Sequence, residues 1–260
     1  MDAKTAQALN ALNRTFYCDL AEEFSATREG PWPGWLRLLS AIDRYYPTAD
    51  LEVLDVGCGN GRFASFLATN LPSRHERVRY LGIDASAAML ERAGAVALPF
   101  ASTEYRLWDL VNTPLREGLA ARSFSLTVLF GFLHHVPGLA RRRELIRDAA
   151  ICLRPGGLLA FTCWQFDKIE RFREKAISWK EFNLTAELPI DVDELEPGDR
   201  LLPWGDSGRV VRYCHFADEE ETAQLTRGLP LELVETYRAD GREGNLNQYF
   251  IFRRLQTESA

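Results

Sequence analysis

Short apolar runs alternate with amphipathic stretches along most of this chain. Runs rich in branched and aromatic residues predict buried strands at residues 51–56, 78–84, 104–108, 124–130 and 158–164. Helical patterns or helix start signals separate these runs. Strands that alternate with helices are typical of an α/β protein with a doubly wound, mostly parallel sheet.

The chain departs from this alternation before the first strand and after the fifth. Helices are predicted at 6–23 and 36–46, and the prolines and glycines between them exclude regular structure. This segment is either a lid over a pocket or an anchor in which Trp32 and Trp35 fix the helices to the core. Residues 165–210 are interpreted as an insertion beside the active site.

The insertion and the C-terminal part carry weaker patterns. A mixed-charge amphipathic helix is predicted at 168–182, and an acidic loop at 191–199. A short helix at 218–226 precedes an antiparallel hairpin of 231–238 and 247–253. We therefore expect an N-terminal cap (1–46), one main domain (47–254) that contains the insertion, and a frayed tail (255–260).

Composition narrows the class of protein. The 260 residues are 46% hydrophobic with a formal net charge of -6, which suits one globular domain and argues against general nucleic-acid affinity. No apolar run approaches ~18 residues and the N-terminus lacks a signal-peptide pattern. The cysteines are odd in number and lack C-x-x-C spacing. We expect reduced thiols in a cytoplasmic protein, no metal site, and neither membrane nor DNA as partner.

The stretch from Leu51 to Phe63 carries most of the chemical information. A buried strand carries Asp55 near its end, and Gly57, Gly59 and Gly61 follow at alternate positions before a helix begins. Backbone N–H groups converge at a helix N-terminus, and glycine allows a ligand to approach closely. A dinucleotide fingerprint is spaced G-x-G-x-x-G instead, so a nicotinamide-type Rossmann loop is the alternative.

Polar residues also follow the second and third predicted strands. Asp84 stands where a carboxylate can bind both hydroxyls of a ribose, although it can also serve only to cap the helix that begins at Ser86. Asp109 and Leu110 are placed to flank an adenine, and the alternative is that Asp109 is an ordinary turn residue.

The fourth predicted strand ends at Phe130, beside the expected ligand crevice. His134 and His135 follow closely, so one of them is a candidate to meet a substrate, and the alternative is a structural role. The next predicted helix, 139–153, carries four arginines. They are interpreted either as a solvated face or as an RNA contact.

The glycine pattern with Asp55, Asp84 and the Pro155–Gly157 turn resembles the class I S-adenosylmethionine (SAM) methyltransferases. This resemblance implies a Rossmann-like seven-stranded sheet with an N-terminal helical cap and an insertion after the fifth strand. It also implies SAM as cofactor. The residues that would bind it are Asp55, Gly57, Gly59, Gly61, Asp84, Asp109, Leu110 and Phe130.

Motifs outside that core resemble a narrower family, the tRNA wobble-uridine methyltransferases. They are Phe24–Arg28, Pro31–Pro33, His134–His135, Leu202–Trp204 and Arg212–Phe216. That family esterifies the carboxylate of 5-carboxymethyluridine at the wobble position. The resemblance implies the anticodon loop of tRNA as partner and a small zinc-binding activator subunit.

A carboxylate acceptor sets modest chemical demands. Its pKa is near ~4, so it is ionised at neutral pH and needs no general base, only alignment and a cationic or hydrogen-bonding clamp. Trp32 and Tyr213 can stack on a flipped base. Arg28 is placed to reach either the methionine carboxylate or the acceptor. Candidates for the clamp are Arg28, His134, His135, Arg212 and Tyr213, with His215.

Two other functions remain open at this point. One is a SAM-dependent O-methyltransferase acting on a small carboxylic acid or related metabolite. The other is a SAM-binding regulatory or scaffold protein without turnover.

Overall fold

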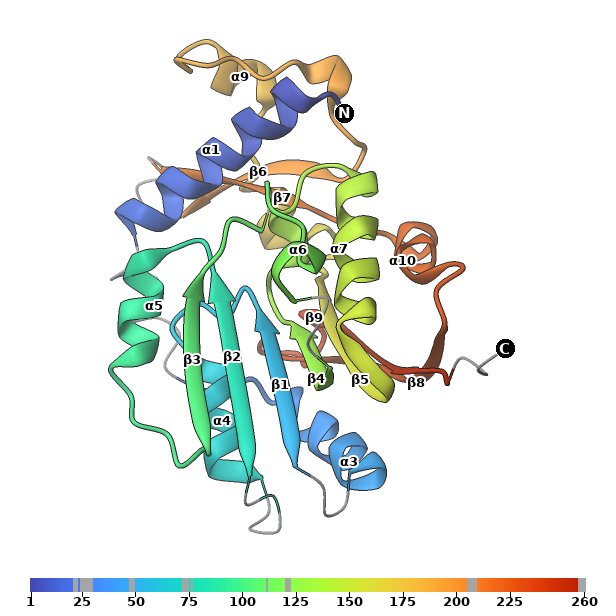
Figure 1. Cartoon of the computed structure of the whole chain (residues 1–260). Helices are drawn as coiled ribbons and strands as arrows, with labels where there is room; N and C mark the ends of the chain where they lie inside the picture. The colour runs from blue at the N-terminus through green and yellow to red at the C-terminus, as the bar shows by residue number, and fades with distance from the viewer. Residues whose placement is uncertain are drawn as a thin grey trace.

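A seven-stranded sheet forms the centre of the part of the chain that the computed structural model describes (Figure 1). That part comprises residues 1–20, 23, 30–46, 50–71, 75, 77–110, 112–119, 123–204 and 210–256. The strand order is β3-β2-β1-β4-β5-β9-β8. The strands are β1 (Leu51–Val56), β2 (Val78–Asp84), β3 (Ser102–Leu107), β4 (Phe124–Leu129), β5 (Leu153–Trp164), β8 (Leu231–Ala239) and β9 (Asn247–Arg254).

Strands β1 to β5 are parallel, β9 pairs antiparallel with β5, and β8 pairs antiparallel with β9, so that β8 runs in the same direction as β1 to β5. The predicted α/β sheet is confirmed. Strand β5 begins at Leu153, earlier than the predicted Leu158, and its register against β4 shifts between Phe124 and Leu126. Strand order reverses between β1 and β4, and ligands bind at the carboxyl ends of strands beside such a reversal.

Helices cover both faces of the sheet because both faces are apolar. One face packs on α3 (Trp35–Tyr45) and α4 (Arg62–Asn70), and the other packs on α6 (Arg116–Leu119), α7 (Leu139–Ile151) and α10 (Glu219–Thr226). Helix α5 (Ala87–Gly94) follows β2, and the Ser86 side chain caps it as predicted. Burial of these side chains is the main favourable term that holds the layers together.

The predicted helix at 168–182 is wrong. The segment forms three short turns of helix, η2 (Phe166–Lys168), α8 (Glu170–Arg173) and α9 (Trp179–Asn183). Ile177 pairs instead with Leu201 as an isolated β-bridge, and Ser178 is extended. The backbone of Ile177 therefore pairs with Leu201 and is not available for the hydrogen bonds of a continuous helix. The acidic stretch after it contains only the short turn η3 (Val192–Glu194).

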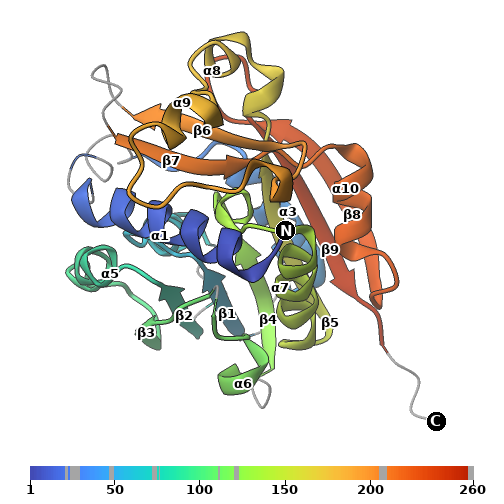
Figure 2. The ribbon, with the colours of Figure 1, turned by 90° about the horizontal axis from the view of Figure 1, so that it is seen from above.

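The rest of the insertion continues into a two-stranded sheet of β6 (Asp199–Trp204) and β7 (Val210–His215). Helix α1 (Ala3–Asp19) lies against this hairpin, and both stretch over the carboxyl ends of the main strands (Figures 1 and 2). Near these ends, η1 (Leu133–His135) carries the histidine pair. The hairpin and α1 thus roof the edge at which the glycine loop lies.

The turn after β8 fixes the segment before α3. Asp240 has a positive φ of 68° and is 4% exposed. Its carboxylate accepts hydrogen bonds from the Gly34 backbone N–H (2.9 Å), the Asn247 amide (2.8 Å) and the Tyr249 hydroxyl (2.6 Å). One side chain therefore joins the chain entering α3 to both strands of the closing hairpin.

We predict that Asp240→Ala lowers the free energy of unfolding by about 3 kcal/mol, because it leaves buried donors without an acceptor and places a Cβ-bearing residue without a polar side chain at positive φ. Asp240→Asn keeps one oxygen acceptor and tolerates this backbone conformation, so it should cost less. Urea unfolding of both variants measures the difference. Equal losses in the two variants would contradict this account.

Candidate functional site

A cavity of about 640 Å³ lies at the carboxyl ends of the central strands. The glycine loop and the segments that follow β2, β3 and β4 line one part of it. The rest is lined by one side of α1, the segment that leads into α3, the insertion with β6 and β7, and the turn between β8 and β9. Its size is in the range of small-molecule pockets.

The glycine loop shapes one wall of this cavity. The backbone N–H groups of Gly57 and Cys58 donate to the Ile83 carbonyl at 2.8 and 3.1 Å, which turns the loop over the end of β2. Gly57 and Gly59 have φ of +75° and +55°. A Cβ at Gly57 would lie 2.6 Å from the Phe132 ring, whereas a Cβ at Gly59 would meet nothing within 4 Å. Gly59 therefore leaves room for a ligand.

Asp84 organises the junction of the loop and helix α5. Its carboxylate accepts from the N–H groups of Gly59 and Ser86, each at 2.9 Å, and it lines the cavity. Burial raises the pKa of Asp84 although these N–H groups favour the anion. Each carboxylate oxygen has a second lone pair, so the helix-capping role and a ribose-binding role are compatible.

Asp109 also lines the cavity, at the end of β3. It accepts from Arg14 of α1 at 3.2 Å and from the Asn112 amide at 2.8 Å. Leu110, in contrast, is 1% exposed in the main core and does not line the cavity. The expectation that Leu110 packs on an adenine is corrected: the chain turns after Asp109 and directs the leucine into the sheet–helix interface.

Of the remaining predicted cofactor residues, two line the cavity and one does not. Asp55 and Phe130 line the cavity, and the Phe130 ring contacts Phe63 and Trp35. Gly61 does not line it. It begins α4 at φ +77°, where a Cβ would lie 3.0 Å from both the Ala93 Cβ and the Tyr105 hydroxyl. Gly61 therefore serves helix packing at this position.

Arg62 is a candidate that the sequence analysis missed. It follows the glycine loop at the start of α4 and lines the cavity. Its guanidinium lies 5.4 Å from the Trp32 ring centroid and 5.9 Å from that of Trp35. Trp35 is buried, so it is an anchor, whereas Trp32 is half-buried at the cavity wall. The signal that could have identified Arg62 is a positive charge directly after the glycine loop, at a helix N-terminus that by itself favours negative charge.

The two histidines of η1 have different surroundings, although both line the cavity. His135 Nε2 lies 2.6 Å from the Tyr17 hydroxyl, and Nδ1 lies 3.2 Å from the Tyr213 carbonyl oxygen. The carbonyl lies closer to Nδ1 than the Asn13 amide nitrogen does (3.4 Å), and a carbonyl only accepts, so we assign the proton to Nδ1 and Nε2 as the acceptor from Tyr17. His134 packs on Trp164 with ring centroids 5.1 Å apart. His135 thus ties α1 to β7, and His134 is the better candidate to meet an acceptor.

Arg212 is the most unusual charge in the cavity wall. It is only 5% exposed, and its guanidinium carbon lies 5.1 to 5.4 Å from the ring centroids of three residues that we call the aromatic cage: Phe16, Trp164 and Trp204. Its Nε is buried without a hydrogen-bond partner among the described residues. A buried cation with an open donor is poised to bind an anion.

Tyr213 and His215 do not face this cavity, which corrects their placement in the clamp. Side chains alternate along a strand, so Arg212 and Cys214 occupy one face of β7 while Tyr213 and His215 occupy the other. Tyr213 is fully buried with Leu9 and Ile190, and its hydroxyl donates to Asp199 at 2.7 Å. It therefore cannot stack on a base in this conformation.

Helix α1 contributes residues that were not predicted as site residues. Asn10, Asn13, Arg14 and Tyr17 all line the cavity. Their spacing of three, four and seven residues places them on one helical face. A polar stripe of this kind was the available signal. From the insertion, Phe172, Lys175 and Trp204 also line the cavity.

Two further expectations concern arginines. Arg28 lies outside the described residues. In the α7 run, Arg142 is 1% exposed and Arg141 binds Glu144 and the Leu110 carbonyl, so these two are not on a solvated face. Only Arg143 and Arg147 of that run are exposed.

Two groups of side chains bring possible metal-ligand atoms within 4.8 Å of one another: His134, His135 and Cys214, and Glu196, Asp199 and His215. In the first, both ring nitrogens of His135 already contact protein groups. In the second, the guanidinium of Arg142 is hydrogen-bonded to Glu196 and lies beside His215. We assign neither group as a metal site, and the absence of a metal stays a prediction. No helix in the described ranges has the length and apolar character needed to cross a membrane.

The buried acid of the glycine motif gives a testable pH dependence. Burial raises the pKa of Asp55 to about 7, against a hydrogen bond from Tyr80 that favours the anion. Between the ordinary pKa of an aspartate and 7, the folded state binds more protons than the unfolded state, so stability falls as pH rises through this window.

We predict that Asp55→Asn removes this loss. Its stability relative to the natural chain should increase from pH 4 to 7 by a few kcal/mol, at about 1.4 kcal/mol per pH unit, and then level off. Urea unfolding across that range measures it. A constant difference between the two proteins would contradict the buried, protonated aspartate.

Comparison with known proteins finds methyltransferases among the proteins that this chain resembles. Residues 54–159 match the family of methyltransferase domains. A putative methyltransferase of Encephalitozoon cuniculi is 32% identical over 210 residues, which cover 81% of this chain and 82% of that protein. A tRNA (carboxymethyluridine(34)-5-O)-methyltransferase of Arabidopsis thaliana is 30% identical over 57% of this chain and 31% of that protein. The chain spans less than half the length of the mouse, Arabidopsis and yeast proteins with this name.

Solved structures agree on the fold. A SAM-dependent methyltransferase of Methanosarcina mazei superposes with a TM-score of 0.59 at 18% identity, over 84% of this chain and 98% of that one. An amino pentose methyltransferase of Micromonospora echinaspora with bound SAM gives 0.57 at 19% identity, over 90% and 95%. The sheet order, the glycine loop at its switch point and these relatives lead to one assignment: the chain belongs to the SAM-dependent methyltransferases.

Proposed function

We propose that this protein transfers the methyl group of SAM to the carboxylate of 5-carboxymethyluridine at the tRNA wobble position. The observation that carries the proposal is Arg212, a buried guanidinium in the same cavity as the glycine loop, surrounded by aromatic rings and with an unpartnered Nε among the described residues. A carboxylate is the acceptor group that such a cation binds best.

The cavity fits SAM on its own chemistry. The open space at Gly59 admits the methionine portion, Asp84 can accept from ribose hydroxyls, and Asp109 can accept from an adenine amino group. Arg62 is a cation for the methionine carboxylate, one of the two roles that the sequence analysis considered for Arg28. The cofactor supplies an electrophilic methyl group on a sulfonium.

The chain's own task is then to align and desolvate the acceptor. An ionised carboxylate attacks without a general base, and orientation alone can contribute roughly 7–11 kcal/mol to lowering a barrier. Arg212 holds the carboxylate, and His134 beside Trp164 is placed to donate a hydrogen bond to it. The half-buried rings of Trp32 and Trp164 offer faces on which a base can stack.

The choice of tRNA rests on the relatives. Those named as carboxymethyluridine methyltransferases, from Mus musculus, Arabidopsis thaliana and Saccharomyces cerevisiae, match this chain at 26–30% identity. Lys175 at the cavity wall is a cation suited to a phosphate. The small zinc-binding activator subunit stays a prediction.

A second candidate is SAM-dependent methylation of a small carboxylic acid. The cavity is closed enough to bury Arg212 almost completely, which suits a small acceptor as well as a flipped base. A carboxy-SAM synthase of Hahella chejuensis also matches, at 29% identity over 53% of this chain and 55% of that protein. Each of these reactions would place a carboxyl group in the cavity.

We predict base-labile methyl label in tRNA after incubation with labelled SAM and tRNA that lacks its wobble methyl ester. An ester is hydrolysed by mild base, whereas an N-methyl, C-methyl or ribose O-methyl group is not. Arg212→Ala should lower kcat/KM for tRNA roughly 10- to 150-fold, the effect of losing a hydrogen bond to a charged group. Arg44→Ala is the matched control, because Arg44 is exposed on α3 and does not line the cavity.

Base-stable label would move the chemistry to another atom of tRNA. Label in small acids but not in tRNA would support the second candidate. Equal activity of the two arginine variants would contradict the role of Arg212.

A further inference from the structure

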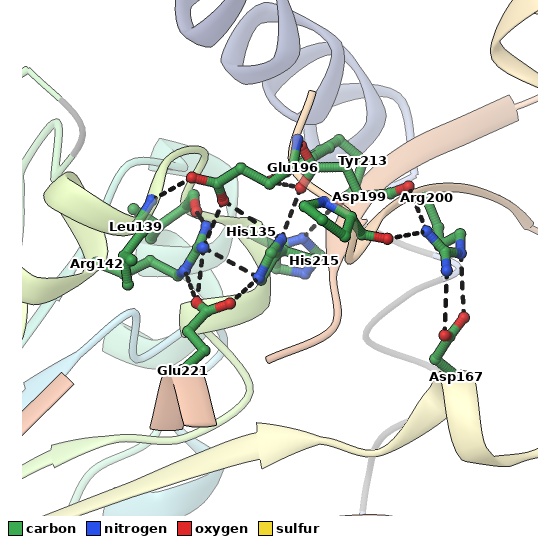
Figure 3. A network of polar contacts seen from close by, with 12 residues as sticks. His135, Leu139, Arg142, Asp167, Glu196, Asp199, Arg200, Tyr213, His215 and Glu221 are labelled. Atoms are coloured by element: carbon green, nitrogen blue, oxygen red, sulfur yellow. Dashed lines mark hydrogen bonds and ion pairs between the residues drawn. The ribbon is translucent and has the colours of Figure 1, made fainter. Parts of the chain in front are cut away.

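A buried ionic network joins the insertion to the core behind β7 (Figure 3). We call it the ionic junction, and it consists of Arg142, Glu196, Asp199, His215 and Glu221. They come from α7, the segment before β6, β6 itself, β7 and the first turn of α10. None of the five lines the cavity, so the proposed methyl transfer does not use them directly.

His215 lies at the centre of this junction and is 2% exposed. Its Nδ1 is 2.7 Å from Asp199 Oδ1, and its Nε2 is 2.7 Å from Glu221 Oε2. Carboxylate oxygens accept hydrogen bonds, so these two contacts favour the imidazolium form, although the Arg142 guanidinium, which is itself a donor, also lies 3.0 Å from Nε2. Burial lowers the pKa of His215, but the bonds to Asp199 and Glu221 outweigh it and raise the pKa above its ordinary value.

Arg142 connects Glu221 and a further carboxylate, Glu196, to the turn that carries the histidine pair. Its guanidinium donates to Glu196 at 2.6 Å, to Glu221 at 2.7 Å and to the Val136 carbonyl at 2.9 Å. Glu196 also accepts from the Leu139 N–H at 2.7 Å. Three carboxylates therefore face two cations when His215 is protonated, and one cation when it is neutral.

The junction reaches the acceptor side through β7. His215 and Arg212 are on opposite faces of this strand, three residues apart. Between them, the Tyr213 backbone N–H donates to Asn13 Oδ1 at 2.8 Å, and the Tyr213 carbonyl contacts His135 Nδ1. Any displacement of β7 at His215 therefore moves both Arg212 and the partner of His135.

We propose that His215 is a positioning residue: clamped as an imidazolium between Asp199 and Glu221, it fixes β7 and thereby holds Arg212 at the acceptor side of the cavity. The expected effect on methyl transfer rests on the proposed function, whereas the expected effect on the stability of β7 does not. Loss of the proton removes one hydrogen bond and leaves an excess of buried carboxylates, so β7 loosens as pH rises.

The other ionisable groups around His215 come from η1, α7, β5, β7, α10, β6 and the segment that leads into β6. Arg142 and Tyr213 have raised pKa values, and burial raises the pKa of Cys163 to about 12. Glu221 has a lowered pKa, because the bond from His215 and the charge of Arg142 outweigh its burial. Glu196, Asp199 and His134 also face this region. His215 and His134 are the histidines of this set, so their ordinary pKa is the one nearest to neutrality.

The sign of the effect follows from the raised pKa. The contribution of His215 is complete below the ordinary histidine pKa and is lost as pH rises through the raised value. Methyl transfer should accordingly have an alkaline limb that appears in KM for the acceptor, since Arg212 binds the acceptor carboxylate. The affinity for SAM should not change across this limb.

The first test is an NMR titration of the histidine side chains in the full-length protein. His215 should titrate above the ordinary value, and Glu221→Gln should lower its pKa by roughly one to three units, as expected on loss of an adjacent opposite charge. His75→Gln assigns another signal and serves as control, because His75 lies near Asp43, away from the junction. Hydrogen exchange of β6 and β7 should accelerate above the titration midpoint.

The second test is kinetic. His215→Gln should raise KM for the acceptor roughly 10- to 100-fold at pH 7, the cost of small misplacement, with little change in SAM affinity, and should abolish the alkaline limb. The double variant His215→Gln/Glu221→Gln restores the natural balance of charge in the junction. Its KM for the acceptor should therefore be lower than that of His215→Gln, and closer to that of the natural chain, at all pH values.

Three results would overturn the proposal: a His215 pKa at or below the ordinary value, hydrogen exchange of β7 that is independent of pH, or equal KM values for the natural chain and His215→Gln. If tRNA is not methylated at all, the titration and hydrogen exchange still decide the structural claim, so failure of the proposed function is distinguishable from failure of this one.

Discussion

The cost of burying charge governs the arrangement around the cavity. Removing a guanidinium from water is expensive unless other groups replace the lost hydration. Arg142 meets this requirement inside the protein, with two carboxylates and a carbonyl around it. Arg212 has three aromatic rings around it instead and retains a donor without a partner among the described residues. The fold therefore satisfies the first arginine, and the second is the one that we propose binds the acceptor.

The sheet makes this contrast possible. Reversal of strand order between β1 and β4 opens a crevice at their carboxyl ends, where the glycine loop and Asp84 lie. Helix α1 and the β6–β7 hairpin then cover the crevice and bury Arg212 (Figure 2). A carboxylate that entered would meet a cation in low dielectric, where the attraction is much stronger than in water.

Much of the main domain could be predicted from local patterns. Apolar runs place the parallel strands, and the spacing of glycines with Asp55 and Asp84 locates the cofactor side, since these signals lie within a few residues of one another. The 168–182 segment was misread because its helical periodicity is local, whereas the Ile177–Leu201 bridge that interrupts it is a tertiary contact. Tyr213 and Arg212 were placed together because the motif was read as a unit. Recognising 210–215 as a strand would have separated them by alternation. Leu110 and Gly61 adjoin ligand-facing residues but turn toward the core, which only packing decides.

The central claim is that one cavity holds SAM at the glycine loop and the acceptor carboxylate at Arg212. The most direct measurement is a crystal structure with S-adenosylhomocysteine and an anticodon stem-loop that contains 5-carboxymethyluridine. This account predicts the ribose at Asp84, the carboxylate within hydrogen-bond distance of Arg212, and one of its oxygens directed at the sulfur. A carboxylate bound elsewhere, or a stem-loop that leaves the cavity empty, would contradict it.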